Sequence, residues 1–176
     1  MKFSSVSMAF GLAGLVNSLD MALYSEGPGI DAGFKAYLEE LYLMTEDPVV
    51  TTTFSDFFTP DGQLIVRGIV ATGSEEIIAM KERLMPTDGH KRWNHRPNVT
   101  TVDSESATEK VFQVLGVIET SYSGGNCSQS YYSTRFHVLK DASGALSMKT
   151  HAGNLAKYDD FIIEPSVTPT DIACGT

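Results

Sequence analysis

The chain has 176 residues, of which 42% are apolar, which is enough for one globular domain but short for two. Its 13 Lys and Arg residues are outnumbered by 22 Asp and Glu residues, giving a formal net charge of −9. Because the densest basic cluster holds only Lys91, Arg92 and Arg96, the composition argues against a nucleic-acid partner, which would need many clustered cations.

The first 18 residues have the layout of a secretory signal peptide. One Lys is followed by the uncharged stretch from Phe3 to Val16, and Val16 and Ser18 are suitable cleavage-site residues. The alternative is an ordinary apolar N-terminal helix. Cleavage after Ser18 would remove the only basic residue of the segment and no acid, changing the net charge from −9 to −10. We therefore expect a secreted, extracellular protein without a membrane segment after processing.

Two further features agree with export. The two cysteines, Cys127 and Cys174, both follow the predicted signal, and in an oxidising compartment they are expected to form a disulfide. Closing that loop would add roughly 4 kcal/mol in the chain-entropy model. Unpaired thiols are the alternative. N-glycosylation sequons occur at Asn98 and at Asn126, and the first is the stronger because the second contains Cys127.

The helical part of the chain follows a lead segment at residues 19–30. Apolar residues from Ile30 to Met44 recur at helical spacing, with Asp31 as the expected cap and Pro48 at the end. An aromatic stretch at 53–58 is expected to end at a Pro60-Asp61-Gly62 turn. Short strands at 63–66 and 69–72 and a helix beginning at Ser74 should follow.

The second half of the chain predicts a sheet. Four Val-, Thr- and aromatic-rich segments are expected to be strands, at 91–102, 110–122, 131–140 and 145–152. Their short polar or glycine-containing links indicate antiparallel hairpins. The predicted class is therefore α+β, with N-terminal helices packed in a strongly curved antiparallel sheet over residues 31–160. Residues 161–176 are expected to form an extended tail.

This order of elements carries three short motifs, namely 57–62 (FFTPDG), 73–78 (GSEEII) and 93–95 (WNH). Together they resemble the SnoaL-like branch of the nuclear transport factor 2-like superfamily over roughly residues 31–158. The resemblance implies a cystatin-like α+β cone with a deep pocket. This superfamily contains polyketide cyclases, isomerases and scytalone dehydratase, besides many non-catalytic binding domains. The fold alone therefore selects no function.

The resemblance also implies a pocket-facing His on the first long strand, and His95 matches it. Two departures from scytalone dehydratase stand beside that match. The next strand, 110–122, contains no His, and the Tyr-Asp pair expected at the end of the first helix is only mimicked by Thr45-Glu46-Asp47. Dehydration by that arrangement is therefore not predicted.

Strand alternation gives an independent prediction for His95. A glycan on Asn98 must face solvent, so Trp93, His95 and Val99 should point inward, unless Pro97 introduces a bulge. An inward His beside a Trp favours a general acid/base that acts on an apolar or aromatic molecule. A hydrogen-bonded core histidine is the alternative.

Alternation also orders the other candidates. Tyr132 and Phe136 share an apolar face that is expected to line the pocket, whereas His137 should lie outside. Glu119 is a candidate proton carrier among apolar neighbours, although it is near a strand end, where solvation is the alternative. His151 is a secondary ligand-binding candidate that would need a bulge to face inward.

Two candidates come from the helical half. Tyr37 could orient a carbonyl or water, and Asp56 could hold His95 in one tautomer; core packing and a solvent-facing carboxylate are the respective alternatives. The four His residues are not closely spaced, so no metal site is predicted. The sequence contains no phosphate-loop or dinucleotide-binding motif, so no cofactor is predicted either.

The leading functional hypothesis is a secreted small-molecule-binding protein that acts as a cofactor-independent lyase, isomerase or cyclase with His95 as acid/base. The alternative is a non-enzymatic binding or interaction module of the same fold. The superfamily resemblance also implies a homodimer formed through the outer face of the sheet.

Overall fold

The computed structural model describes residues 19–163, so the predicted signal peptide and residues 164–176 of the predicted tail lie outside the described residues. The elements in chain order are β1 (Ser25–Glu26), α1 (Phe34–Glu46), α2 (Thr52–Ser55), β2 (Phe58–Val66), β3 (Ile69–Thr72), α3 (Gly73–Leu84), β4 (Lys91–Glu105), β5 (Glu109–Tyr122), β6 (Cys127–Leu139) and β7 (Leu155–Ile163).

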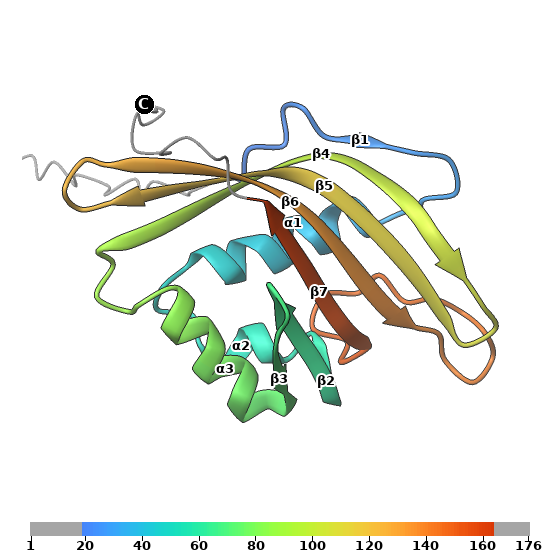
Figure 1. The fold of residues 1–176 in the computed structure, drawn as a ribbon. Helices are drawn as coiled ribbons and strands as arrows, with labels where there is room; N and C mark the ends of the chain where they lie inside the picture. The colour runs from blue at the N-terminus through green and yellow to red at the C-terminus, as the bar shows by residue number, and fades with distance from the viewer. Residues whose placement is uncertain (1–18, 164–176) are drawn as a thin grey trace, which may run out of the picture.

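The strands form one curved sheet that arches over α1, as Figure 1 shows. Their spatial order is β1-β4-β5-β6-β7-β2-β3. The neighbours from β4 to β7 are antiparallel, whereas β2 pairs with β7, and β1 with β4, in parallel. This arrangement confirms the predicted α+β class. Among residues 19–163, no helix has the length and apolarity that a membrane crossing needs.

Helix α1 forms because its apolar residues fall on one stripe, and that stripe is fully buried against the sheet. It begins at Phe34, not at Ile30, because Gly33 adopts a positive φ of 94° immediately before it. The expected cap, Asp31, instead forms an ion pair with Lys110 at 2.5 Å. The helix ends at Glu46, just before Pro48, as expected from the proline.

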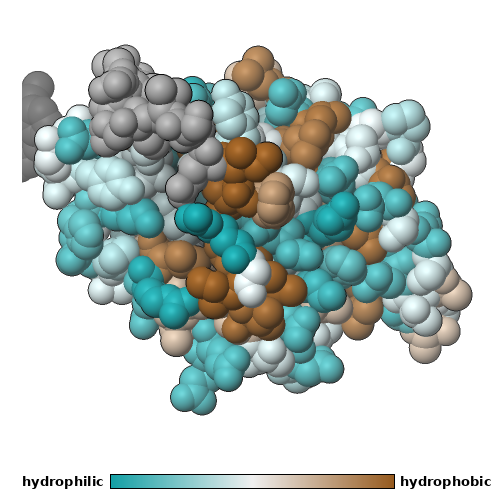
Figure 2. Space-filling model, viewed as in Figure 1, coloured by the Kyte–Doolittle hydropathy of each residue, from teal (hydrophilic) through white to brown (hydrophobic). Residues whose placement is uncertain are grey.

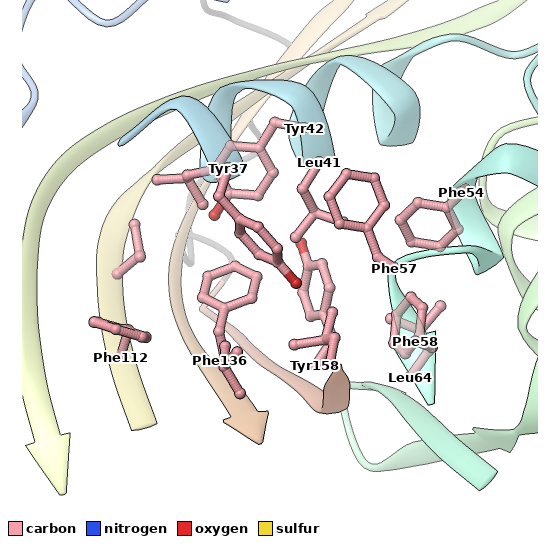
Figure 3. Packing of buried hydrophobic residues seen from close by; sticks show 14 of the residues in the cluster. Tyr37, Leu41, Tyr42, Phe54, Phe57, Phe58, Leu64, Phe112, Phe136 and Tyr158 are labelled. Atoms are coloured by element: carbon pink, nitrogen blue, oxygen red, sulfur yellow. The ribbon is translucent and has the colours of Figure 1, made fainter. Parts of the chain in front are cut away.

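Figure 3 shows the core beneath the sheet, where aromatic side chains from α1 meet those of β5, β6 and β7. Phe34 stacks on Phe112 with ring centroids 4.0 Å apart, and Phe136 meets Tyr158 edge-on at 4.9 Å. These rings are almost completely buried. Each buried ring of this size contributes a large apolar stabilisation.

The alternation predicted for the long strands is largely confirmed. On β6 the residues Tyr132, Thr134, Phe136 and Val138 are buried, and His137 lies on the outer face. On β4 the prediction for Val99 is wrong, because the register shifts between Pro97 and Val99. This irregularity reverses the parity, so Thr100 is the fully buried residue.

The last strand is Leu155–Ile163, so the predicted strand at 145–152 is wrong. Residues 141–154 form a loop with one isolated bridge, in which the Asp141 carboxylate accepts main-chain N–H bonds from Ser143 and Ala145. The true strand was hidden because its consecutive acids, Asp159 and Asp160, interrupt the apolar pattern. The strand also continues three residues past the predicted domain boundary at 160.

The Pro60-Asp61-Gly62 segment is not a turn but part of β2. The register between β2 and β7 shifts between Phe58 and Gln63, so these residues form an irregularity inside the strand. A Cβ atom at position 62 would lie 2.9 Å from the Phe58 Cβ, which explains why a glycine stands there.

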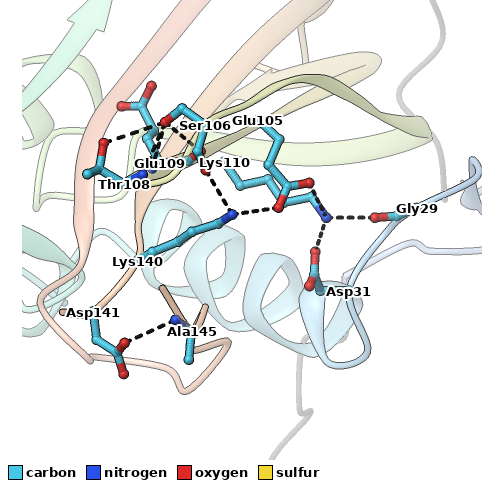
Figure 4. A network of polar contacts seen from close by, with 10 residues as sticks. All are labelled: Gly29, Asp31, Glu105, Ser106, Thr108, Glu109, Lys110, Lys140, Asp141 and Ala145. Carbon is cyan, nitrogen blue, oxygen red and sulfur yellow. Dashed lines mark hydrogen bonds and ion pairs between the residues drawn. The ribbon is translucent and has the colours of Figure 1, made fainter. Parts of the chain in front are cut away.

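The predicted lead segment is an integral part of the fold. Figure 4 shows the Lys110 ammonium bonded to the Gly29 carbonyl at 2.8 Å and to the Asp31 carboxylate. Glu105 bridges Lys110, at 3.5 Å, and Lys140, at 2.6 Å. Through these contacts of Lys110, the segment before α1 is bonded to the end of the β4–β5 hairpin.

Candidate functional site

A cavity of about 170 Å³ opens between β4–β7 on one side and β2 and α3 on the other. On the face seen in Figure 2, apolar surface gathers at the centre and is bordered by hydrophilic residues. The cavity is lined by Thr45, Phe54, Leu64, Val66, Arg67, Lys81, Leu84, Lys91, Trp93, His95, Ile118, Thr120, Tyr122, Ser128, Ser130, Tyr158, Asp160 and Ile162.

His95 is the central polar group of this cavity and is held by Glu46 from the last turn of α1. The Glu46 Oε1 atom lies 2.9 Å from the imidazole Nδ1 and also accepts the His95 main-chain N–H. The two side chains are only 3% and 14% exposed. Because a carboxylate accepts hydrogen bonds, Nδ1 carries the proton and Nε2 of the neutral ring is a proton acceptor.

Three aromatic rings fix the orientation of the His95 imidazole. Tyr42 stacks on it with centroids 4.3 Å apart and planes 12° from parallel. Trp93 and Tyr132 meet it edge-on at 6.1 and 5.7 Å. The ring therefore stands in one packed position, as a positioned acid/base requires.

Asp160 brings a second ionisable group to the same cavity from β7. It is 5% exposed, and burial raises the pKa of its carboxyl to about 6, although a hydrogen bond from the Thr134 hydroxyl opposes this. The positive charge that His95 can carry also favours ionisation of Asp160. Burial likewise raises the pKa of the neighbouring Tyr158 hydroxyl. The cavity thus brings an imidazole and a buried carboxyl group together in one wall.

Lys81 is a buried cation in the cavity wall. Its side chain leaves α3, is 2% exposed, and donates to the Asp47 carbonyl at 2.7 Å and to the Val50 carbonyl. Both acceptors follow the end of α1, where the helix dipole favours a positive charge. Burial lowers the pKa of this ammonium.

Known proteins were compared with this chain in sequence and in structure. No protein-family model matches the chain, and no curated protein matches its sequence. Among solved structures, ActVI-ORFA of Streptomyces coelicolor is 14% identical and has a TM-score of 0.56 over 74% of this chain and 97% of its own. A putative scytalone dehydratase of Novosphingobium aromaticivorans is 12% identical, with a TM-score of 0.57 over 78% and 89%. Nuclear transport factor 2 of Cryptosporidium parvum is 12% identical, with a TM-score of 0.54 over 83% and 100%.

The chain has the SnoaL-like, nuclear transport factor 2-like fold.

Within this SnoaL-like fold, His95 and Trp93 line the cavity, as their predicted inward orientation requires. Tyr132 contacts the imidazole edge-on but does not line the cavity, so its predicted ligand contact is corrected to support of His95. Phe136 is fully buried in the filled part of the core and does not reach the cavity. Its predicted ligand contact is therefore corrected to a packing role.

The two other predicted catalytic residues lie away from His95. Asp56 is exposed at the end of α2, and its main-chain carbonyl accepts the Gly153 N–H. The carboxylate that holds His95 is Glu46, because the end of α1 and not α2 faces β4. Tyr37 is fully buried, meets Phe57 edge-on at 5.2 Å and lines no part of the cavity, so it packs the core.

Glu119 and His151 are also placed elsewhere. Glu119 lies on the outer face of β5, where its carboxylate is 3.0 Å from the Arg96 guanidinium. His151 lies in the loop before β7 with a positive φ of 55°, against the ring of Phe57. Its Nδ1 is 3.1 Å from the Thr53 carbonyl. Neither residue contributes to the cavity.

The export-related residues are partly described. Cys127 is buried at the start of β6, and Cys174 lies outside the described residues, so their pairing stays a prediction. Asn98 and Asn126 are both exposed, as sites for glycans must be. Within residues 19–163, no three His, Cys, Asp or Glu side chains gather in a group suited to a metal ion.

Three site residues were missed by sequence reasoning. Glu46 enters the sequence prediction only as part of a mimic of a Tyr-Asp pair, and neither Asp160 nor Lys81 is among the predicted candidates. The available signal for Lys81 was its place on the apolar stripe of α3, which puts a cation into the interior.

Proposed function

We propose that this protein binds a small aromatic or apolar molecule and moves a proton on it without a cofactor, as a lyase, isomerase or cyclase does. The observation that carries this proposal is the hydrogen-bonded Glu46–His95 pair, in which His95 lines an open cavity and Glu46 holds it from behind the cavity wall. The structural neighbours named as a scytalone dehydratase and a ketosteroid isomerase-like protein support the reaction class by analogy.

In the proposed reaction His95 is the base. The Nε2 atom takes a proton from carbon of the bound molecule, and the imidazolium that forms is stabilised by the Glu46 carboxylate at Nδ1. Asp160 is the second proton carrier, because its pKa of about 6 lets it both donate and accept near neutral pH. The proton leaves one group and returns through the other or through water.

The cavity volume sets the size of the reacting part. A cavity of about 150 Å³ holds a benzene ring, so about 170 Å³ accommodates one substituted aromatic ring. Phe54, Trp93 and Ile118 supply the apolar wall for such a ring. A fused polycyclic molecule would have to extend through the opening of the cavity.

A general-base probe tests the proposal. In 5-nitrobenzisoxazole a base removes the ring C–H proton, the N–O bond breaks, and a nitrile and a coloured phenolate form. We expect turnover that falls at least tenfold in His95→Gln and several-fold in Glu46→Gln. Asp160→Asn should remove the contribution of the Asp160 carboxyl, with its pKa of about 6, from the rate profile.

The matched control is His137→Gln, which makes the same change on the outer face of β6. This variant should retain the wild-type rate. Equal turnover in the His95 and His137 variants would remove His95 from the mechanism and favour a non-enzymatic carrier of the same fold.

A second proposed property is self-association through the outer sheet face. Exposed apolar side chains gather there from β5, β6 and β7, namely Leu115, Tyr131, Phe161 and Ile163. A patch of this kind on an otherwise charged surface favours a partner. We expect a dimer by light scattering in the wild type and a monomer in Tyr131→Lys; a monomeric wild type would contradict this.

We also propose that the chain is exported, processed after Ser18, disulfide-bonded at Cys127 and Cys174, and glycosylated at Asn98. N-terminal sequencing and the intact mass of the secreted product, before and after reduction and deglycosylation, test each step separately. A mature product that begins at Met1 would contradict export by this signal.

A further inference from the structure

The cavity differs in charge from the rest of the molecule. The whole chain carries −9, but the charged residues that line the cavity are three cations, Arg67, Lys81 and Lys91, and one acid, Asp160. The cavity wall therefore has the opposite sign to the surface. A neutral ring would need no such reversal.

We infer that the cavity binds an aromatic anion, most simply a ring carrying a carboxylate, and that Lys81 is the residue that selects its charge. This inference rests on the proposed function, since it names the substrate class of the same site. It is carried by the position of Lys81 and by the composition of the cavity wall.

The hydrogen bonds of Lys81 leave one N–H donor of its ammonium group for an anion. An ammonium group has three N–H donors, and here two go to the neutral carbonyls of Asp47 and Val50. Within residues 19–163, no carboxylate forms an ion pair with this 2%-exposed ammonium, although Asp47 and Glu82 lie near enough to favour its charge. A buried cation without an ion-pair partner is costly, and a ligand carboxylate would offset that cost.

The remaining wall suits the ring of such an anion. Trp93 presents its indole to the cavity, and the Lys91 ammonium lies 5.0 Å from the centre of that ring. The Trp93 indole, together with Phe54 and Ile118, gives an apolar surface beside the cationic groups. An amphiphilic anion satisfies both parts, whereas a neutral ring satisfies only the apolar part.

The test uses Trp93 as an optical reporter, because it is the only tryptophan of the chain and lines the cavity. Benzoate, benzamide and benzylamine, which share one ring and differ in charge, are titrated against its fluorescence at low salt. We expect benzoate to bind at least tenfold more tightly than benzamide, and benzylamine to bind most weakly. Benzamide binding as tightly as benzoate would overturn the inference.

Variants locate the selectivity. Lys81→Met should reduce the benzoate preference at least tenfold, and Lys81→Arg should restore most of it. Lys35→Met is the control, because it removes the same charge from an exposed position on α1. The comparison of benzoate with benzamide in the wild type keeps the inference testable even if Lys81→Met does not fold. Unchanged benzoate preference in a folded Lys81→Met would also overturn it.

Failure of this inference can be told apart from failure of the proposed function. Ring binding without charge preference, together with His95-dependent turnover of the benzisoxazole, would refute only the anion. The absence of both ring binding and His95-dependent turnover would refute both proposals.

Discussion

The concave face of the sheet has two different ends. One end is filled by packed side chains, and the other end, which is hollow, contains the cavity. At the filled end, β5 and β6 contribute Phe112 and Phe136, which meet α1. At the hollow end the same strands contribute Thr120, Ser128 and Ser130. The comparison teaches that small polar side chains, and not sheet curvature alone, leave the space for a ligand.

Helix α1 serves both ends. Its first turns bury Phe34 and Leu38 completely in the core, whereas its last turn supplies Thr45 to the cavity wall and Glu46 to His95. A well-packed helix therefore positions Glu46 against His95. This arrangement couples the placement of His95 to the packing at the other end.

The largest expected effect comes from emptying the filled end. Phe136→Ala should lower the free energy of unfolding by about 3–5 kcal/mol, because a fully buried ring is removed and leaves a void. Urea denaturation measures the loss. Val49→Ala is the control, since that side chain is 71% exposed in the loop after α1 and should change stability by less than about 0.5 kcal/mol.

The next effect comes from removing charge at the hollow end. The folded pKa of Asp160, about 6, lies above the ordinary value near 3.9, so the folded state binds more protons between these pH values. This contribution to stability is complete below about pH 4 and is lost as the pH rises through 6. Its size is about 3 kcal/mol at 1.36 kcal/mol per pKa unit.

Asp160→Asn should abolish this pH dependence, so the variant gains about 3 kcal/mol relative to the wild type between about pH 4 and pH 7. Denaturant titrations across that range measure the gain. Asp159→Asn makes the same charge change on the neighbouring residue of β7 and serves as the control. A constant difference between the Asp160 variant and the wild type would contradict the assigned pKa.

The smallest effect comes from filling the hollow end. Ser130→Val should raise stability by about 0.5–1 kcal/mol, because it places apolar atoms in the cavity. The same change should weaken benzoate binding. Ser133→Val, on the outer face of β6, should leave binding unchanged; equal binding losses in both variants would show that filling the cavity is not the cause.

Much of the fold could be predicted from the sequence where the apolar pattern was regular. The alternation on β6 predicted the buried face of Tyr132 and Phe136, and the segment before Pro97 predicted an inward His95. Both predictions rest on residues upstream of any bulge. Local periodicity is sufficient there because one face of the strand is buried and the other is not.

The polar residues of the candidate site could not be predicted because they break that pattern. Asp160 is an acid at a buried strand position, so β7 did not read as a strand, and Lys81 is a cation on an apolar stripe. Glu46 reaches His95 from 49 positions away, a contact that no local pattern encodes. Departures from local rules at buried positions are expected to mark functional sites.

The short strand β1 has a consequence for the solubility of the protein. Among residues 19–163, β1 pairs with the outer edge of β4 only at Val99 and Thr100, so no other described strand covers the rest of that 15-residue edge. Pro97 lacks an N–H donor, two register shifts disturb the ladder, and the predicted glycan at Asn98 stands beside them. The edge is thereby made a poor template for growth of intermolecular sheets, a property that would matter most if the proposed export takes the protein away from intracellular chaperones.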